Sequence, residues 1–245
     1  LIHFIGKGIL YHHTLFWPSI LKGTNYRLPN KIVAFSYGNL EGRKMSKSRG
    51  WYLSVNDFLS IFEADSLRYY WIAATPLSED ADFVLDEFSN RYNNELADTL
   101  GNFVHRALVF CSKYFDSIIP EISNKKEEKI ILEKITETNK IVEDSIEKFE
   151  LREGLLSIIG LARFGNKYFN DTAPWENIKK DLNKAKDTIA LCIKIVKAIG
   201  VLILPYLPDT GNKIIEMLNL NNNEIKWSDA NKSINTNHKI LKPKV

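Results

Sequence analysis

The sequence predicts a mainly α-helical protein in two parts, a short α/β segment followed by a helical bundle. Two observations lead to this prediction. The first part is rich in turn-forming residues, which are Gly6, Gly8, Gly23, Pro29, Gly38, Gly42 and Gly50. After residue 80 the chain runs in long helical patterns with few breakers. The shift from turn-rich sequence to helical patterns places a domain boundary near 78–84. We therefore expect a first domain at 1–80, a helical domain at 81–220 and a polar segment at 221–245.

The first part contains one clear strand signal. The apolar run IVAFSY at 32–37 ends before a glycine, which is typical of a buried strand. The segment contains no glycine-rich phosphate loop, and one strand is too little for a complete doubly wound domain. We therefore expect it to be a part of a larger α/β sheet.

Helices are also expected in the first part. One covers 8–23, and Pro18 kinks or divides it, because proline lacks the N–H that a helix interior needs. Two short helices in sequence are expected at 56–75, the first of them capped by Asn56 or Asp57.

The helical domain begins with the strongest helix prediction, 86–115. At about 100° per residue its apolar side chains fall within an arc of about 80°, and they are Leu96, Leu100, Phe103, Ala107, Phe110 and Tyr114. Further helices are expected at 125–149, 153–171, 183–203 and 208–219. Four to five antiparallel helices with short connections predict a bundle.

Composition narrows the class of protein. The 245 residues carry a formal net charge of +3, which is compatible with nucleic-acid binding without indicating it. Cys111 and Cys192 lie far apart without a CxxC pair, so the sequence suggests neither a disulfide framework nor a zinc site. No run of about 18 apolar residues and no signal peptide is found. We expect a cytoplasmic protein, or a piece of one, since the chain opens with Leu1.

The stretch EGRKMSKSRG at 41–50 is the most informative. It places four cations, Arg43, Lys44, Lys47 and Arg49, between two glycines. Like charges repel, so this cluster favours an anionic partner, and both lysines can reach one polyphosphate. A cationic loop suits a reaction in which phosphate leaves, because its donors tighten on the transition state. For a short basic motif alone, the alternative is a solvated basic turn or a localisation signal.

In full, the loop reads KMSKS and resembles the signature of the class I aminoacyl-tRNA synthetases. The flanks HFIGKGILYHHTLFWPSIL and YRLPNKIVAFSYGNLEGRKMSKSRG are similar to the methionyl-tRNA synthetase family, and the resemblance runs from His3 to about Pro243. It implies the C-terminal part of a Rossmann-like α/β catalytic domain, followed by an anticodon-binding α-helical bundle. It also implies methionine, ATP with Mg²⁺ as its substrate complex, and tRNA(Met) as partners.

The resemblance assigns the loop to ATP. Lys47, and to a lesser degree Lys44, would stabilise the pyrophosphate and are the expected catalytic residues. Met45, Ser46 and Ser48 would complete the ATP-binding loop, where each serine can donate a hydroxyl hydrogen bond. The resemblance implies no metal site within this chain.

The same resemblance assigns Ile9 and His13 to the methionine side chain. Their i,i+4 spacing would place them on one helix face. An apolar residue beside an imidazole suits a thioether, which is bulky, polarisable and a weak acceptor. Gly8 departs from the family, which usually has aspartate there. Without the motif, His13 reads as a partly buried structural histidine.

In the bundle, the resemblance assigns Asn102, Arg106 and Trp175 to the anticodon of the tRNA. Asp98 departs from the family pattern, because an asparagine is expected there. On a helix, Asp98, Asn102 and Arg106 form one stripe centred about 120° from the apolar arc. Arginine and asparagine can bond base edges or phosphates, and an indole can stack on a base. A solvated helix face beside an edge tryptophan is the alternative.

The HIGH sequence that class I synthetases need for ATP is not found in this chain. The most similar stretch, YHHT at 11–14, does not qualify, because it lies too close before the lysine loop and inside the predicted first helix. The chain is therefore expected to be a fragment, one half of a split enzyme with a separate N-terminal chain, or an incompletely recorded sequence. Two functions follow: a methionine–tRNA ligase, or a non-catalytic tRNA-binding module when the chain is isolated. A helical scaffold without RNA is a third reading.

Overall fold

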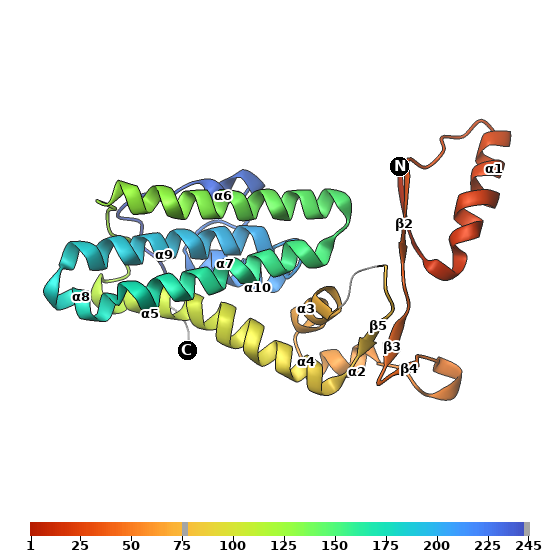
Figure 1. Cartoon of the computed structure of the whole chain (residues 1–245), viewed down its shortest axis with the longest axis horizontal. Helices are drawn as coiled ribbons and strands as arrows, with labels where there is room; N and C mark the ends of the chain where they lie inside the picture. The colour runs from red at the N-terminus through yellow and green to blue at the C-terminus, as the bar shows by residue number, and fades with distance from the viewer. Residues whose placement is uncertain (75–77, 243–245) are drawn as a thin grey trace.

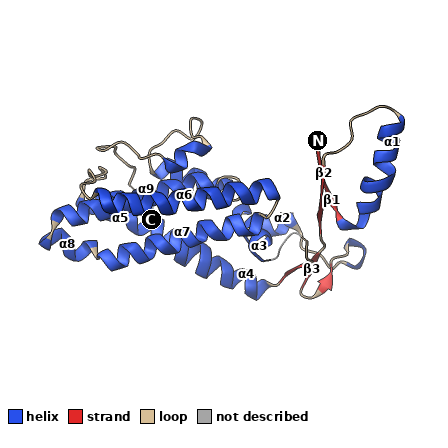
Figure 2. Ribbon diagram, turned by 45° about the horizontal axis from the view of Figure 1, so that its top comes forward, coloured by secondary structure: helices blue, strands red, loops and turns tan. Residues whose placement is uncertain are grey.

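A computed structural model describes residues 1–74 and 78–242 and shows a long helical bundle with a narrow α/β arm beside it (Figure 1). Helices dominate, as the sequence predicts, and the strands are confined to the arm and its base (Figure 2). Thr75, at the end of a predicted helix, and 243–245 of the predicted polar segment lie outside the described residues.

The bundle is built around α9, Leu182–Ile203, which is buried on almost every side. Most of its residues are apolar, and a helix that is apolar on most faces belongs inside a core, because each such face needs an apolar partner. The helices that pack on it are α5 (Asn102–Tyr114), α6 (Lys125–Lys148), α7 (Leu151–Thr172), α8 (Pro174–Lys180) and α10 (Pro208–Met217).

The four helices predicted after residue 120 are confirmed as α6, α7, α9 and α10, with ends close to those expected. The short helix α8 was not predicted. It arises because Ala173 takes a left-handed conformation, with φ of 40°, which ends α7. Pro174 then starts α8, where its fixed φ suits the first turn.

The helix predicted at 86–115 is confirmed as one continuous run in three segments. These are α4 (Leu85–Arg91), the π-helical η4 (Tyr92–Gly101) and α5. Of the predicted apolar arc, Leu100, Phe103, Ala107 and Phe110 are buried. Leu96 is half-buried and Tyr114 is exposed, because Leu96 lies in the more widely wound π segment and Tyr114 lies at the helix end.

The arm contains a β-helix-β unit. Its strands β1 (Ile2–Gly6) and β2 (Lys31–Phe35) pair in parallel. The prediction at 32–37 is confirmed as β2, whereas β1 was missed because His3 and Gly6 make its five residues a weak strand signal. A parallel pair needs a crossover between its strands, and the helical turns that follow β1 supply it.

The helix predicted at 8–23 is divided, as Pro18 indicated. Its segments are the 3-10 turn η1 (Lys7–Ile9), the π-helical η2 (His12–Phe16) and α1 (Trp17–Gly23). Pro18 lies in the first turn of α1, directly after the π-helical turn of η2.

A second sheet forms the base of the arm. It contains β3 (Gly38–Leu40), β4 (Arg43–Lys44) and β5 (Ala81–Phe83), in the order β4-β3-β5. Strands β3 and β4 are joined through Glu41 and Gly42, whose φ angles are 50° and 74°. Two successive positive φ values match the right-handed twist of a hairpin, and the glycine at position 42 adopts such a value without strain.

The two helices predicted at 56–75 are α2 (Val55–Leu59) and α3 (Ala64–Ala74). The predicted cap at Asn56 or Asp57 is wrong. Ser54 is the N-cap, and its Oγ accepts a hydrogen bond from the Asp57 N–H at 3.3 Å. Ser54 has the extended backbone that an N-cap requires.

Helix α3 ties the base of the arm to the bundle. Asp65 Oδ2 accepts hydrogen bonds from the Thr210 N–H and Oγ1 at 2.6 and 2.7 Å. Arg68 Nε donates to the carbonyl of Tyr206 at 2.6 Å, and Arg152 Nε of α7 donates to that of Ala73 at 2.9 Å. Three side chains thus fasten one short helix to the bundle.

The segment predicted as a polar loop or tail, 221–245, is packed on the bundle over its described residues. It contains a 3-10 helix, η5 (Trp227–Asn231), that lies against α9 and α6. Ala230 and Ile240 are buried, and Ile240 N–H donates to the Ser117 carbonyl at 2.8 Å. A few well-placed apolar residues are enough to anchor a polar segment, which composition alone does not reveal.

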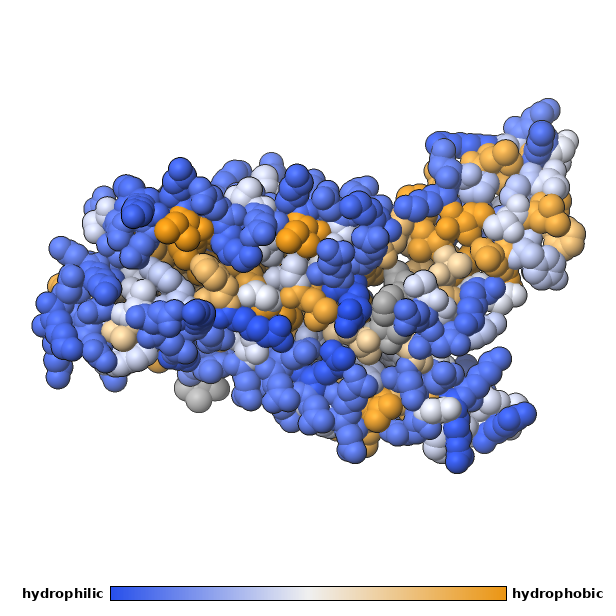
Figure 3. Space-filling view, in the orientation of Figure 1, coloured by the Kyte–Doolittle hydropathy of each residue, from blue (hydrophilic) through white to orange (hydrophobic). Residues whose placement is uncertain are grey.

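Apolar side chains gather on the exposed surface of the arm, as the orange region at the right of Figure 3 shows. They include Phe4, Leu15, Phe16, Trp17 and Ile20. Within the described residues, no helix has both the length and the apolar composition needed to cross a membrane.

Candidate functional site

The lysine-rich loop follows the last residue of β4 and closes on itself between Ser46 and Trp51. Ser46 N–H donates to the Trp51 carbonyl at 2.6 Å, and Trp51 N–H donates back to Ser46 at 3.0 Å. Between them lies a 3-10 turn, η3 (Lys47–Arg49). The turn ends at Gly50 with φ of 65°, a left-handed conformation that favours glycine. The loop therefore has a fixed base and a short, exposed tip.

The polar groups of the loop point to solvent. The hydroxyls of Ser46 and Ser48 lie 3.1 Å apart, so the two serines of the motif form one polar group. Arg43 lies over the ring of Trp51, 5.3 Å from its centroid. In the described part of the chain, no ion pair engages Lys47. Its ammonium is free to bind an anion.

Lys44 lies beside a second cation, Lys7, that sequence reasoning did not single out. Both ammonium groups lie 4.8 Å from the centroid of the Tyr37 ring. Asp80 pairs with Lys7, and the Tyr37 N–H donates to Asp80 Oδ1 at 2.9 Å. The hydrogen bond from Lys7, followed by that from the Tyr37 backbone, holds the pKa of Asp80 below its usual value.

The two residues assigned to methionine lie on the arm. Ile9 ends the 3-10 turn and is 45% exposed, whereas His13 lies in the π-helical turn and is half-buried. The chain between them is therefore not a regular α-helix. Their i,i+4 spacing consequently does not place the two side chains on one face, as it would in a regular α-helix. Ile9 is accessible to a ligand, while His13 is partly enclosed.

His13 has an aromatic neighbour that the sequence did not reveal. The rings of His13 and His3 meet edge to face with centroids 5.7 Å apart. The Nδ1 atoms of both rings are shielded from solvent and have no hydrogen-bond partner. His3 belongs to β1, so recognising that strand would have been the signal that places it near the first helical turn.

The departure at Gly8 has a steric explanation. A Cβ built at this position would run into the hydroxyl of Tyr37. An aspartate here would require the Tyr37 ring to move, and glycine lets the ring lie against the turn.

At the far end of the bundle, Arg106 and Trp175 both lie against the ring of Phe169. The Arg106 guanidinium is 4.5 Å from the Phe169 ring centroid, and its Nη2 donates to Asn170 Oδ1 at 2.8 Å. The Trp175 ring lies 5.8 Å from that of Phe169 and is 45% exposed. A cation held by a hydrogen bond and a partly exposed indole can bind and stack on a base.

The other two members of the predicted stripe are exposed. Asn102 begins α5, one turn before Arg106, and faces solvent. Asp98 lies in the π-helical η4, so the wider winding turns it relative to the stripe that a regular α-helix would give. Asn102 and Arg106 are therefore one regular α-helical turn apart, whereas Asp98 is separated from Asn102 by π-helical winding.

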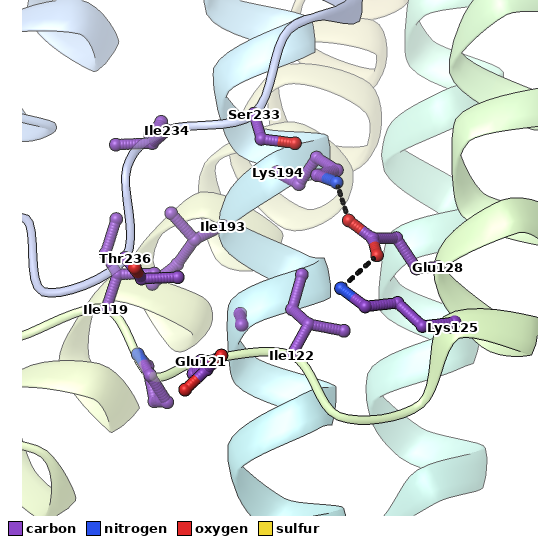
Figure 4. A pocket seen from close by; sticks show the side chains of 12 residues that line it. Ile119, Glu121, Ile122, Lys125, Glu128, Ile193, Lys194, Ser233, Ile234 and Thr236 are labelled. Carbon is purple, nitrogen blue, oxygen red and sulfur yellow. Dashed lines mark hydrogen bonds and ion pairs between the residues drawn. The ribbon is translucent and has the colours of Figure 1, made fainter.

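A separate cavity of about 230 Å³ lies between α6, α9 and the C-terminal segment (Figure 4). Glu128 lies between two ammonium groups there, with Oε1 2.6 Å from Lys194 Nζ and Oε2 3.0 Å from Lys125 Nζ. The hydrogen bond from Lys194 holds the pKa of Glu128 below its usual value. Because both oxygens of the carboxylate are engaged, the cluster acts as an internal tie between helices.

A metal site usually requires a cluster of ligand side chains, and a reactive thiol usually requires an accessible thiolate. Across 1–74 and 78–242, no cluster of three or more His, Cys, Asp or Glu side chains could hold a metal ion. Cys111 and Cys192 are both buried. Burial raises the pKa of Cys111 to about 12, so this thiol stays protonated and unreactive at neutral pH.

Two family models match the chain in succession. Residues 1–108 match the class I tRNA synthetase (M) model, and residues 119–243 match the anticodon-binding domain of methionyl tRNA ligase.

Relatives and solved structures agree with these models. A methionine–tRNA ligase of Methanosphaera stadtmanae is 47% identical over 89% of this chain and 32% of its own length. One of Methanobrevibacter smithii is 43% identical over 99% of this chain and 37% of its own. Mycobacterium tuberculosis methionyl-tRNA synthetase in complex with methionyl-adenylate has the same fold, with a TM-score of 0.94 at 24% identity, over 99% of this chain and 49% of that one. The chain thus spans about a third of the length of the curated relatives.

Proposed function

The chain belongs to the methionyl-tRNA synthetase family, and we propose that it is the part of such an enzyme that carries the pyrophosphate-binding loop and the anticodon reader. The complete enzyme would join methionine to ATP, giving methionyl-adenylate and pyrophosphate, and then pass the methionyl group to the terminal ribose of tRNA(Met). The observation that carries the proposal is the exposed KMSKS loop on its rigid hairpin base.

In this reaction the loop would act on the leaving group. Attack of the methionine carboxylate on the α-phosphate releases pyrophosphate, and the developing negative charge needs fixed cations more than covalent help. Lys47, which no carboxylate engages in the described residues, and Lys44 on β4 would supply them. Ser46 and Ser48 would donate hydroxyl hydrogen bonds to the same phosphates. The ATP would arrive with Mg²⁺.

Ile9 and His13 would contact the methionine side chain. The open side chain of Ile9 offers an apolar surface, and the half-buried ring of His13 offers an aromatic edge. Both suit a polarisable thioether.

The far end of the bundle would read the anticodon. Arg106, held by Asn170, would bond a base edge or phosphate, and the exposed face of Trp175 would stack on a base. Asn102 would add an amide one turn away. In this proposal residues 1–80 belong to the catalytic domain and 81–220 to the anticodon-binding domain.

An N-terminal part, either on the same polypeptide or as a separate chain in the cytoplasm, would complete the catalytic site. A second function, a tRNA-binding module without catalysis, is favoured for the isolated chain, since the apolar surface of the arm is uncovered.

Two measurements test the proposal. Methionine-dependent exchange of pyrophosphate into ATP is expected from the chain completed with an N-terminal part and not from the chain alone. Binding of the chain to tRNA(Met), compared at fixed salt with the same tRNA carrying an altered anticodon, is expected to favour the natural anticodon. Equal binding to both would overturn the anticodon role, and a completed protein without exchange would overturn the ligase.

A further inference from the structure

Tyr37 lies where two cationic segments of the chain meet. It follows β2 and precedes β3, and its side chain is 41% exposed. Lys7, from the turn after β1, and Lys44, at the end of β4, each place an ammonium group 4.8 Å from its ring centroid. That distance is within the range of a cation–π contact.

The β3–β4 pairing explains why Lys44 reaches this ring. Asn39 lies directly opposite Lys44, and Tyr37 precedes Asn39 by two residues, so all three share one side of the hairpin. Diagonal neighbours across a strand pair are within reach of aromatic and long side chains. The position of Tyr37 therefore follows from the strand register, not from a flexible side chain alone.

Backbone hydrogen bonds hold Tyr37 in place. Its N–H donates to Asp80 Oδ1, and its carbonyl accepts from the Ala81 N–H, both at 2.9 Å. On the other side, the missing side chain of Gly8 leaves room for the phenol hydroxyl. The residue is thus fixed by its backbone and accommodated by a glycine.

Charge balance favours the same arrangement. Lys7 and Lys44 repel each other, and Asp80, which pairs with Lys7, offsets that repulsion. The hydrogen bond from Lys7, followed by that from the Tyr37 N–H, keeps the pKa of Asp80 low, and the charges of both lysines act in the same direction. Lys7 is therefore neutralised by Asp80, and Lys44 keeps an ammonium with no ion-pair partner in the described chain.

We infer that Tyr37 positions Lys44 for the departing pyrophosphate, by holding its ammonium over the aromatic ring; this rests on the proposed function. A lysine side chain in water samples many rotamers, and fixing it in advance lowers the entropy lost when it binds. Tyr37 does not touch the phosphates in this scheme. It acts through Lys44, and Asp80 neutralises the neighbouring Lys7.

The first test is direct and needs only this chain. The signals of the Lys44 ε-methylene protons should show a ring-current shift that is kept in Tyr37→Phe and lost in Tyr37→Leu. An unshifted Lys44 in the unaltered chain would overturn the inference regardless of any enzyme activity.

The second test is a double-mutant cycle on pyrophosphate exchange in the completed enzyme. Tyr37→Leu should lower kcat/KM for ATP by about two- to five-fold, the scale of an exposed cation–π contact, and Tyr37→Phe should stay close to the unaltered enzyme. In a Lys44→Met background, Tyr37→Leu should cause no further loss.

The outcomes separate the two proposals. An equal loss from Tyr37→Leu with and without Lys44 would mean that the tyrosine only supports the fold, and the inference would fail. A completed enzyme without any exchange would instead remove the proposed function, while the ring-current measurement would still decide whether Tyr37 holds Lys44.

Discussion

Tyr69 and Tyr70 are neighbours in α3, yet their rings are buried in two different hydrophobic clusters. Tyr69 packs into the core of the bundle, and its hydroxyl donates to Glu95. Tyr70 packs with Phe58, Phe83 and Phe88, a cluster that also contacts Leu40 of β3. Successive residues of a helix point about 100° apart, so one short helix can serve two cores. Through α3, the position of the loop is linked to that of the bundle.

Tyr70→Phe should loosen the sheet beneath the loop and leave the bundle intact. The Tyr70 hydroxyl donates to the Asp82 carbonyl at 2.8 Å and accepts from the Val84 N–H at 3.1 Å. Leaving these buried groups unpaired costs about 1–3 kcal/mol. Hydrogen exchange should speed up at 81–84. Tyr69→Phe is the matched control, and it should leave exchange at 81–84 unchanged; the same pattern from both variants would contradict the two-cluster arrangement.

Two glycines of α7 should respond to alanine in opposite directions. A Cβ at Gly165 would run into the buried ring of Phe103, so Gly165→Ala should destabilise the protein by about 1–3 kcal/mol. At Gly160 no atom outside its chain neighbours and the backbone of its own helix lies within 4 Å of the added Cβ. Gly160→Ala should therefore stabilise the helix by about 0.5–1 kcal/mol. Urea unfolding of both variants measures the difference, and equal shifts would refute the packing of α7 on α5.

Glu128→Gln should remove a pH-dependent part of the stability. Lys194, 4% exposed, holds the pKa of Glu128 low, so the ion pair is fully present above the unfolded pKa of about 4.3. Its contribution is lost as pH falls through the lower folded pKa. At pH 7 the variant should be less stable by about 1–3 kcal/mol, and the difference should shrink below about pH 4.

The control for this prediction lies on the same helix. Lys129 and Glu133 form an exposed pair at 3.9 Å, and Glu133→Gln should change stability little at any pH. The free energy of unfolding of Glu128→Gln, plotted against pH, would contradict the prediction if it ran parallel to that of the unaltered protein from pH 7 to pH 3, because the Glu128–Lys194 pair would then not titrate as described.

Lys47→Ala should slow methionine activation in the completed enzyme by about 10²–10³-fold, the scale of losing one transition-state donor. Binding of methionine should hardly change, because the proposed role concerns the leaving group. Single-turnover formation of methionyl-adenylate is the measurement, with Lys129→Ala on the bundle surface as a control that should have no effect. An unchanged rate would remove Lys47 from the mechanism.

Trp175→Ala should weaken binding of tRNA(Met) about ten-fold, since stacking of one base on an aromatic ring contributes about 1–3 kcal/mol. Trp175→Phe keeps a ring and should retain most of the affinity. Filter binding at fixed salt, with the anticodon-altered tRNA as competitor, measures both. A loss of equal size for the two tRNAs would mean that Trp175 contributes to binding without recognising the anticodon.

The sequence by itself determined the helices of the bundle and the lysine loop. Helices α6, α7, α9 and α10 could be located because their apolar residues repeat with the helical period over many turns, a local signal. The loop was found because residues 41–50 place four cations between two glycines, and because part of this stretch reads KMSKS.

Only the tertiary structure decided which distant residues meet. The helical turns that follow β1 bring His13 back to His3, and the pairing of β3 with β4 and β5 brings Lys44 to Tyr37 and Asp80. The burial of Ile240 in an otherwise polar segment was likewise hidden, since it depends on a partner surface. Strand register and long-range contacts depend on the whole fold, so no local pattern in the sequence encodes them.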